Sequence, residues 1–379
     1  MSMKYPPQFE GINKKYFKLY DEHLKLSGMK DGTIKAKFWI VHQFIKFNGN
    51  DNLKRTTKEE VEKYILHRRE KCKPKTVHND IIDLRLFFKW LIPDNDFFEG
   101  VKSKAPRNHL PIKELILPDD VKRLVAATNT QRDRALLMVL WDSAARISEI
   151  LDLNIGDLEF DKYGCVCIVE GKTGMRRLRL IESVPDLQLW CNMHPDRDNR
   201  SAPLFPVTRK RDGKFSRLNI RTVENLFKTV ARDAAITKNV HPHGFRHGRL
   251  TDLVKRGFGE MELRVLAGWG ADSAMPATYI HIAGRDVDKK MLALHGVIED
   301  DTEEQVQELK PIECPRCKTK NPYDTKYCST CSMVLDAETA IKLDEATKIA
   351  DSSITDIMGS RFEELKKAIV NEMLDKMKN

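Results

Sequence analysis

Apolar residues recur at helical spacing through the first part of the chain. The two clearest stripes, with steps of three and four residues, are Ile34, Phe38, Val41 and Ile45, and Ile81, Leu84, Phe88 and Leu91. Each stripe defines the buried face of one helix. Gly28 is a suitable helix end, and Thr57 with Glu60 forms a capping box. The pattern predicts helices over about 11–27, 32–47, 57–70 and 76–92.

The periodicity stops at Pro93 and returns in a mixed form at Pro118. Further helices are predicted over about 118–127, 131–144, 146–152, 185–193, 219–235, 244–256, 260–267 and 286–294. Two β-rich runs, 165–170 and 175–181, are joined by a Gly-Lys-Thr-Gly sequence. This arrangement predicts a hairpin with Lys172 at its tip.

The last forty residues have the pattern of one long helix. Its apolar stripe consists of Met358, Phe362, Leu365, Ile369 and Met373. The stripe is wide enough to need a partner. We expect the partner to be the same helix in another subunit rather than a surface of its own chain.

These patterns divide the chain into six parts. They are a helical domain over 1–93, a basic linker over 94–117, a mixed α+β domain over 118–297, an acidic linker over 298–311, a cysteine-rich module over 312–334 and a helical tail over 335–379. No internal repeat is visible.

Composition restricts the class of protein. The chain has 379 residues, of which 41% are hydrophobic and 32% charged. No apolar run approaches the ~20 residues that span a bilayer, and the N-terminus lacks the apolar stretch of a signal peptide. We therefore expect a soluble, non-secreted, cytoplasmic protein with no membrane partner.

The net charge of +9 is unevenly distributed. Residues 1–111 hold 23 Lys and Arg against 14 Asp and Glu, residues 112–297 hold 30 against 24, and residues 298–379 hold 12 against 18. The first two segments therefore carry the excess positive charge. Such a balance is typical of a protein that binds a polyanion, although a solubilising surface gives the same count.

Four of the eight cysteines are clustered in the spacing Cys314-x2-Cys317-x10-Cys328-x2-Cys331. Two short turns of this kind bring four thiolates into tetrahedral Zn²⁺ geometry. A redox-active dithiol is the alternative, but two matched pairs without a βαβ pattern favour metal. Four sulfur ligands leave no open position, so we expect a structural zinc ribbon. The other cysteines are scattered, which fits a reducing compartment.

Six residues of the first 297 carry recognisable chemistry. They are Arg146, Lys172, His243, Arg246, Trp269 and Tyr279. Each has an ordinary structural interpretation alone: an arginine in a surface ion pair, a lysine in a solvated turn, a histidine or aromatic ring in a core. Together they describe one reaction on a phosphodiester.

In that reaction, two arginines clamp the non-bridging oxygens and offset the charge that develops on the phosphorus. A tyrosine hydroxyl attacks the phosphorus, and a lysine protonates the departing sugar oxygen. A histidine binds the phosphate or accepts the tyrosine proton. No carboxylate cluster accompanies these residues, which argues against a two-metal nuclease. The protein–DNA ester keeps the energy of the broken bond, so we expect the chemistry to need no ATP, metal or other cofactor.

The residues and their order resemble the tyrosine recombinase (integrase) family, of the Xer and phage-integrase type, over about residues 10–297. The family's motifs match Arg146 with Glu149 following, Lys172 in its hairpin, His243, Arg246 and His247 in an H-x-x-R-H element, Gly268 with Trp269, and Tyr279 with His281. Three departures stand out. Ala144 and Ala145 replace the usual glycine before the first arginine, Trp269 replaces the more frequent histidine, and the spacing from Trp269 to Tyr279 is one residue longer.

The resemblance implies an α-helical core-binding domain and a mixed α+β catalytic domain that enclose double-stranded DNA as a clamp. It implies a 3′-phosphotyrosyl bond on Tyr279, phosphate binding by Arg146 and Arg246, and protonation of the leaving oxygen by Lys172. His243 would assist proton transfer, and Trp269 would pack against or bond to the phosphate. Four protomers on two duplexes and a nucleoid location are also implied.

Two other functions use the same residues or the same scaffold. A type IB topoisomerase relaxes a single duplex with nearly the same residue set. A non-catalytic DNA-binding regulator would use the ribbon and the tail as recruitment modules, although the complete residue set argues against this alternative.

Overall fold

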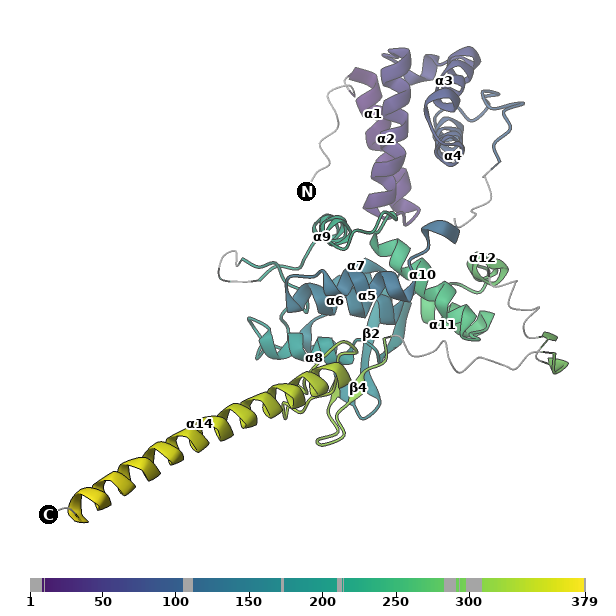
Figure 1. Cartoon of the computed structure of the whole chain (residues 1–379). Coiled ribbons are helices and arrows are strands. Elements are labelled where there is room, and N and C mark those ends of the chain that lie inside the picture. Colours follow the sequence, from purple (N-terminus) through teal and green to yellow (C-terminus); the bar gives the residue numbers. More distant parts are fainter. Residues whose placement is uncertain are drawn as a thin grey trace. The chain divides into compact units, whose positions relative to one another are not determined.

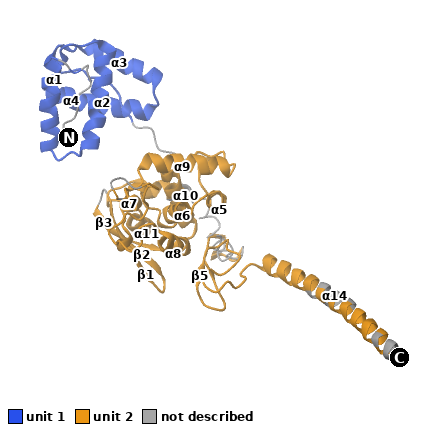
Figure 2. Ribbon diagram, turned by 90° about the vertical axis from the view of Figure 1, so that its left-hand side faces the viewer, with its two compact units in different colours: residues 1–108 blue, residues 109–379 orange. Residues whose placement is uncertain are grey.

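The computed structural model describes residues 9, 11–104, 112–171, 174–209, 213, 215–282, 291–292, 294–297 and 309–377. The chain forms two compact units, Met1–Asn108 and His109–Asn379 (Figure 2). The predicted class, a helical N-terminal domain followed by a mixed α+β domain, is confirmed.

Unit 1 is a bundle of α-helices (Figure 1). They are α1 (Gly11–Leu26), α2 (Asp31–Asn48), α3 (Lys58–Lys71) and α4 (Pro74–Leu91). Every residue of the two predicted stripes is buried. The capping box of Thr57 and Glu60 begins α3 as predicted. Two ion pairs tie the helices together, Lys37 with Asp83 and Arg68 with Asp80.

Unit 2 contains α5 (Pro118–Ala126), α6 (Gln131–Ser143), α7 (Ile147–Leu151), α8 (Val184–Met193), α9 (Ile220–Asp233), α10 (Pro242–Lys255), α11 (Glu260–Ala267), α12 (Met275–Ile282) and α14 (Ala337–Met377). Helix α6 is apolar all round from Ala135 to Trp141, and each of these side chains is buried. A helix of this kind occupies the centre of a domain, and α5, α7, α8 and α10 pack against it.

A three-stranded antiparallel sheet lies on this core, in the order β1 (Glu159–Asp161), β2 (Gly164–Gly171) and β3 (Gly174–Leu180). Cys167 pairs with Leu178, and Gly171 pairs with Gly174 at the end of the predicted hairpin. Strand β1 was not predicted. Helix α12 was not predicted either. The helix predicted over 286–294 falls largely outside the described residues.

The cysteine-rich module contains a short hairpin, β4 (Ile312–Glu313) with β5 (Lys320–Asn321). Arg134 of α6 connects it to the core: its guanidinium group pairs with Asp186 at 2.6 Å and with Asp324 at 2.5 Å. The ring of Tyr323 packs on the same core. Helix α14 follows the module, and its described apolar side chains are exposed.

Candidate active site

Arg246 is the buried centre of the site. It lies on α10 and is only 2% exposed. Its Nη1 donates to the Ala144 carbonyl at 2.8 Å, and its Nη2 donates to the Ala267 carbonyl at 2.6 Å. The guanidinium group also faces the Trp269 ring, 5.6 Å from the ring centre. In the described part of the chain Arg246 has no carboxylate partner, so its charge is left for a ligand.

Burial, with the charge of Arg146 in second place, lowers the pKa of Arg246 to about 10. The group therefore stays protonated at neutral pH. A cation held by two carbonyl groups in a desolvated position attracts an anion more strongly than a solvated cation does.

Arg146 is the N-cap residue of α7 and is hydrogen-bonded to Glu149. The Arg146 peptide N–H donates to Oε2 of Glu149 at 2.8 Å, and its Nη1 donates to Oε1 at 2.9 Å. Arg176 of β3 donates to both oxygens of the same carboxylate. Burial opposes ionisation of Glu149, but these hydrogen bonds outweigh it and lower its pKa to about 2. The carboxylate is therefore ionised and fully paired.

Tyr279, on α12, is fully buried and lies beside α10. Its hydroxyl is hydrogen-bonded to Nδ1 of His247 at 2.5 Å. Its ring stacks on Trp269 with centroids 5.5 Å apart and planes 24° apart. The extra residue between Trp269 and Tyr279 is thus accommodated without separating the two rings. Burial raises the pKa of Tyr279, and the charge of Arg246 only partly offsets this, so the phenol is protonated at neutral pH.

His243 and His247 lie one turn apart on α10, with ring centroids 4.2 Å apart. Burial and neighbouring positive charge lower the pKa of both rings, that of His247 to about 4. Both are therefore neutral, and a neutral imidazole has one nitrogen that accepts a proton. A hollow lined by Glu114, Asn239 and His241 opens beside His247.

The structure thus brings together five of the six candidate residues, Arg146, His243, Arg246, Trp269 and Tyr279. Lys172 lies outside the described residues. From the sequence, proton transfer is assigned to His243. In the structure, the Tyr279 hydroxyl is hydrogen-bonded to His247 instead. Arg176 was missed altogether. The sequence held one sign of its importance. Arg176 is a charged residue on the same side of β3 as Leu178 and Leu180, which are buried.

Ala144 shapes the turn between α6 and Arg146. The sequence has no glycine in this turn, and Ala144 takes the left-handed conformation that glycine adopts most readily, with φ of 49° and ψ of 22°. This conformation directs its carbonyl to Arg246. This left-handed conformation costs a residue other than glycine roughly 1–2 kcal/mol.

Ala144→Gly is therefore expected to leave the free energy of unfolding unchanged within about 1 kcal/mol, because relief of the left-handed strain offsets the lost methyl group and the added chain entropy. The matched control is Ala145→Gly, at a buried neighbour without positive φ. It should destabilise the protein by about 1–2 kcal/mol. Urea unfolding measures both. Equal losses for the two variants would show that the turn is not strained.

The four clustered cysteines have donor atoms within 4.8 Å of one another. Each pair sits in the same kind of turn. The Lys318 N–H donates to the Cys314 carbonyl, the Ser332 N–H donates to the Cys328 carbonyl, and both donors have positive φ. Asn321, fully buried, donates to Sγ of Cys328 at 3.7 Å and accepts from the Ser329 N–H at 2.8 Å. Four converging sulfurs with an outer hydrogen bond fit a metal ion.

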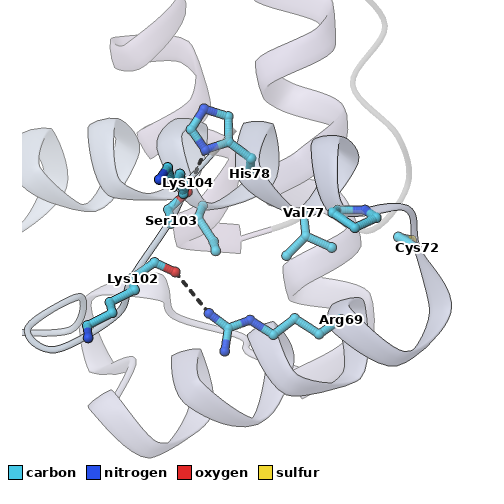
Figure 3. Close-up of a pocket in the computed structure, with 9 residues that line it drawn as sticks. Arg69, Cys72, Val77, His78, Lys102, Ser103 and Lys104 are labelled. Carbon is cyan, nitrogen blue, oxygen red and sulfur yellow. Dashed lines mark hydrogen bonds between the residues drawn. The ribbon is translucent and has the colours of Figure 1, made fainter. Parts of the chain in front are cut away.

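Unit 1 has a basic notch, drawn in Figure 3. The side chains of Arg69, His78, Lys102 and Lys104 surround it. Arg69 donates to the Lys102 carbonyl at 3.0 Å, and His78 is hydrogen-bonded to Ser103 at 2.7 Å. These bonds hold the basic segment 102–104 against α3 and α4.

Comparison with known proteins identifies the class. Residues 114–285 match the phage integrase family, and residues 17–95 match the phage integrase N-terminal SAM-like domain. A tyrosine recombinase of Pseudothermotoga lettingae is 25% identical over 273 residues, which cover 68% of this chain and 90% of that protein. The tyrosine recombinase XerA of Pyrococcus horikoshii is 24% identical and covers 68% of this chain and 85% of its own length.

Solved structures agree on the fold. A lambda integrase dimer bound to a core site aligns with a TM-score of 0.57 at 15% identity, over 73% of this chain and 81% of that one. XerH bound to its difH substrate aligns with a TM-score of 0.53 at 17% identity, over 69% of this chain and 79% of that one. The chain belongs to the tyrosine recombinase family. It is an enzyme of site-specific recombination that cleaves and rejoins DNA strands through a tyrosine. Within the described residues, no helix is long and apolar enough to cross a membrane.

Proposed function

We propose that Tyr279 is the nucleophile, that Arg146 and Arg246 bind the scissile phosphate and that Lys172 is the general acid. The observation that carries this assignment is the hydrogen bond between the Tyr279 hydroxyl and His247, beside the carbonyl-held Arg246. A phenol whose pKa is raised by burial needs a base at contact distance, and neutral His247 is that base.

In the proposed cleavage step, these side chains account for every bond and proton that is transferred. The Tyr279 oxygen bonds to phosphorus while its proton passes to Nδ1 of His247. The bond from phosphorus to the 5′ oxygen breaks, and that oxygen takes a proton from Lys172. Arg146 and Arg246 neutralise the non-bridging oxygens. His243 and Trp269 contact the same phosphate. The 5′-hydroxyl of a partner strand reverses the step, because the 3′-phosphotyrosyl ester retains the energy of the broken bond.

The test separates recombination from its alternatives. Footprinting on a DNA library identifies the site, and two labelled duplexes that carry the site are then incubated with the protein. We expect joined products from two duplexes. Relaxation of a supercoiled plasmid without joining would instead indicate a type IB topoisomerase, and binding without any covalent complex would indicate a regulator.

The DNA contact involves both units. The excess positive charge of residues 1–297 and the basic notch of unit 1 support phosphate contacts by these parts of the chain. Among the solved structures with a similar fold, XerH is bound to its difH substrate and lambda integrase to a core site. The proposed partner is double-stranded DNA in the cytoplasm, at the nucleoid, with four protomers on two duplexes.

The cysteine cluster holds one structural Zn²⁺ in this proposal, as a zinc ribbon with Cys314, Cys317, Cys328 and Cys331 as ligands. Zinc supplies the stability that so short a module cannot obtain from an apolar core. It takes no part in the chemistry on DNA.

We expect one zinc per chain by elemental analysis, and loss of this zinc in Cys328→Ser. The control is Cys72→Ser, in unit 1, which should retain it. Structural zinc is worth on the order of 10 kcal/mol, so a chelator should unfold the module. Arg134 would keep its bond to Asp186, so the catalytic core should remain folded. Protein purified without chelator and found free of zinc would contradict this assignment.

Helix α14 joins protomers in this proposal. Met358, Phe362, Leu365, Ile369 and Met373 are each between 47% and 68% exposed. Removal of residues 336–379 should therefore lower the sedimentation mass, free or on DNA. Phe362→Glu with Leu365→Glu should do the same, whereas Lys367→Glu, on the opposite face of the helix, should not. An unchanged mass after truncation would exclude self-association by this helix.

A further inference from the structure

Arg176 has no role in the reaction proposed above, yet it is the most fully bonded arginine of the site. Its Nη1 and Nη2 donate to the two oxygens of Glu149 at 2.9 and 2.6 Å, and its Nε donates to the Leu266 carbonyl at 3.0 Å. The side chain is only 8% exposed. A planar fork on a carboxylate is a geometry that lysine cannot reproduce.

This pair is enclosed by backbone on both sides. A Cβ at Gly171 would lie 2.5 Å from Oε1 of Glu149, and a Cβ at Gly268 would lie 2.8 Å from Nη1 of Arg176. Gly268 also has φ of 60°. A side chain at this position is therefore disfavoured both by the contact with Arg176 and by the left-handed backbone. The end of β2 and the turn before Trp269 therefore both close on the Arg176–Glu149 pair.

The hydrogen bonds of Glu149 show what the pair does for Arg146. Its carboxylate accepts four: two from Arg176, one from the Arg146 peptide N–H and one from Nη1 of Arg146. Among the described residues, that last bond is the only side-chain hydrogen bond of Arg146. The Arg146 side chain keeps 32% exposure, and its other N–H groups can reach a phosphate.

The balance of charges in the site also indicates that Arg176 frees Arg146 from Glu149. The site holds the guanidinium groups of Arg146, Arg176 and Arg246 around one carboxylate, that of Glu149. Arg176 neutralises this carboxylate, so Arg146 and Arg246 retain two positive charges for a phosphate. Without Arg176, the buried carboxylate would bind Arg146 with both oxygens and withdraw it from the ligand.

We propose that Arg176 is a positioning residue for Arg146: it occupies Glu149 so that the Arg146 guanidinium group remains available to the scissile phosphate. This inference rests on the proposed function, in which Arg146 binds that phosphate. It differs from a purely structural role in one respect. Removal of the charge on Glu149 should make Arg176 dispensable.

The test uses Arg176→Met, Glu149→Gln and the double variant, in single-turnover cleavage of nicked DNA with enzyme in excess. Arg176→Met should slow formation of the covalent complex by about 100-fold, because Arg146, drawn to Glu149, would no longer donate to the developing charge. The double variant should be at least tenfold faster than Arg176→Met. The control, Arg179→Met, changes another arginine of β3, one that pairs with Asp161 of β1 away from Glu149. This variant should change the rate by less than threefold.

A second measurement does not depend on the nucleophile. In a Tyr279→Phe background, the affinity for the same nicked DNA should fall about tenfold with Arg176→Met and recover when Glu149→Gln is added. A double variant as slow and as weakly bound as Arg176→Met would overturn the inference and leave Arg176 a structural residue. Recovery of affinity without any covalent complex in the wild-type protein would keep the inference and refute the proposed function.

Discussion

Tyr279→Phe is expected to abolish the covalent protein–DNA complex while DNA affinity stays within about threefold of the wild-type value. Phenylalanine keeps the ring that stacks on Trp269 and fills the same buried space. Only the oxygen that attacks phosphorus is lost. The hydrogen bond to His247 is lost with it, which should cost about 1 kcal/mol of stability. Denaturing electrophoresis of labelled nicked DNA measures the complex.

The matched control is Tyr163→Phe. Tyr163 precedes the β2–β3 hairpin and is 63% exposed, so this variant should form the covalent complex at the wild-type rate. A retarded protein–DNA band with Tyr279→Phe would show that another residue is the nucleophile. The motif assignment would then be wrong, and the spacing from Trp269 to Tyr279, one residue longer than the family pattern, is where the error would be sought first.

The sequence predicts the helices of unit 1 well because their stripes are periodic and their ends are marked. Helix α12 is different. Met275–Ile282 is short and mostly apolar, without a polar face, so no periodicity distinguishes it from a loop. Its helical form depends on the packing of Tyr279 against α10 and α11. The residue that the motif identifies most clearly therefore lies in an element that the pattern does not predict.

Prediction of the site from the sequence is limited in the same way. Four-residue spacing places His243 and His247 on one face of α10, but only the course of α12 decides that His247 meets the Tyr279 hydroxyl. Alternation along β3 predicts an inward position at 176, where an apolar residue is expected. An arginine there has a physical reason only when Glu149, 27 residues earlier, is brought opposite it. Motifs identify residues, whereas partners depend on the fold.

Arg246→Ala is expected to slow cleavage by two to three orders of magnitude, because one strong donor to a developing charge is worth about 3 kcal/mol or more. It should also destabilise the fold. The buried carbonyl groups of Ala144 and Ala267 lose their donor, at a cost of about 1–3 kcal/mol for each buried group left unpaired. Cleavage must therefore be measured where urea unfolding shows the variant to be folded.

Arg146→Ala separates the two effects. Arg146 is partly exposed, and its partner Glu149 keeps both bonds to Arg176, so this variant should lose rate with little loss of stability. Both arginine variants should remain slow on DNA whose bridging 5′ oxygen is replaced by sulfur, because they act on the non-bridging oxygens. Lys172→Ala should be partly rescued by the same substrate, because a thiolate leaves without a proton. Rescue of Arg246→Ala by sulfur would instead place Arg246 at the leaving group, and the assignment of the two arginines to the phosphate would be wrong.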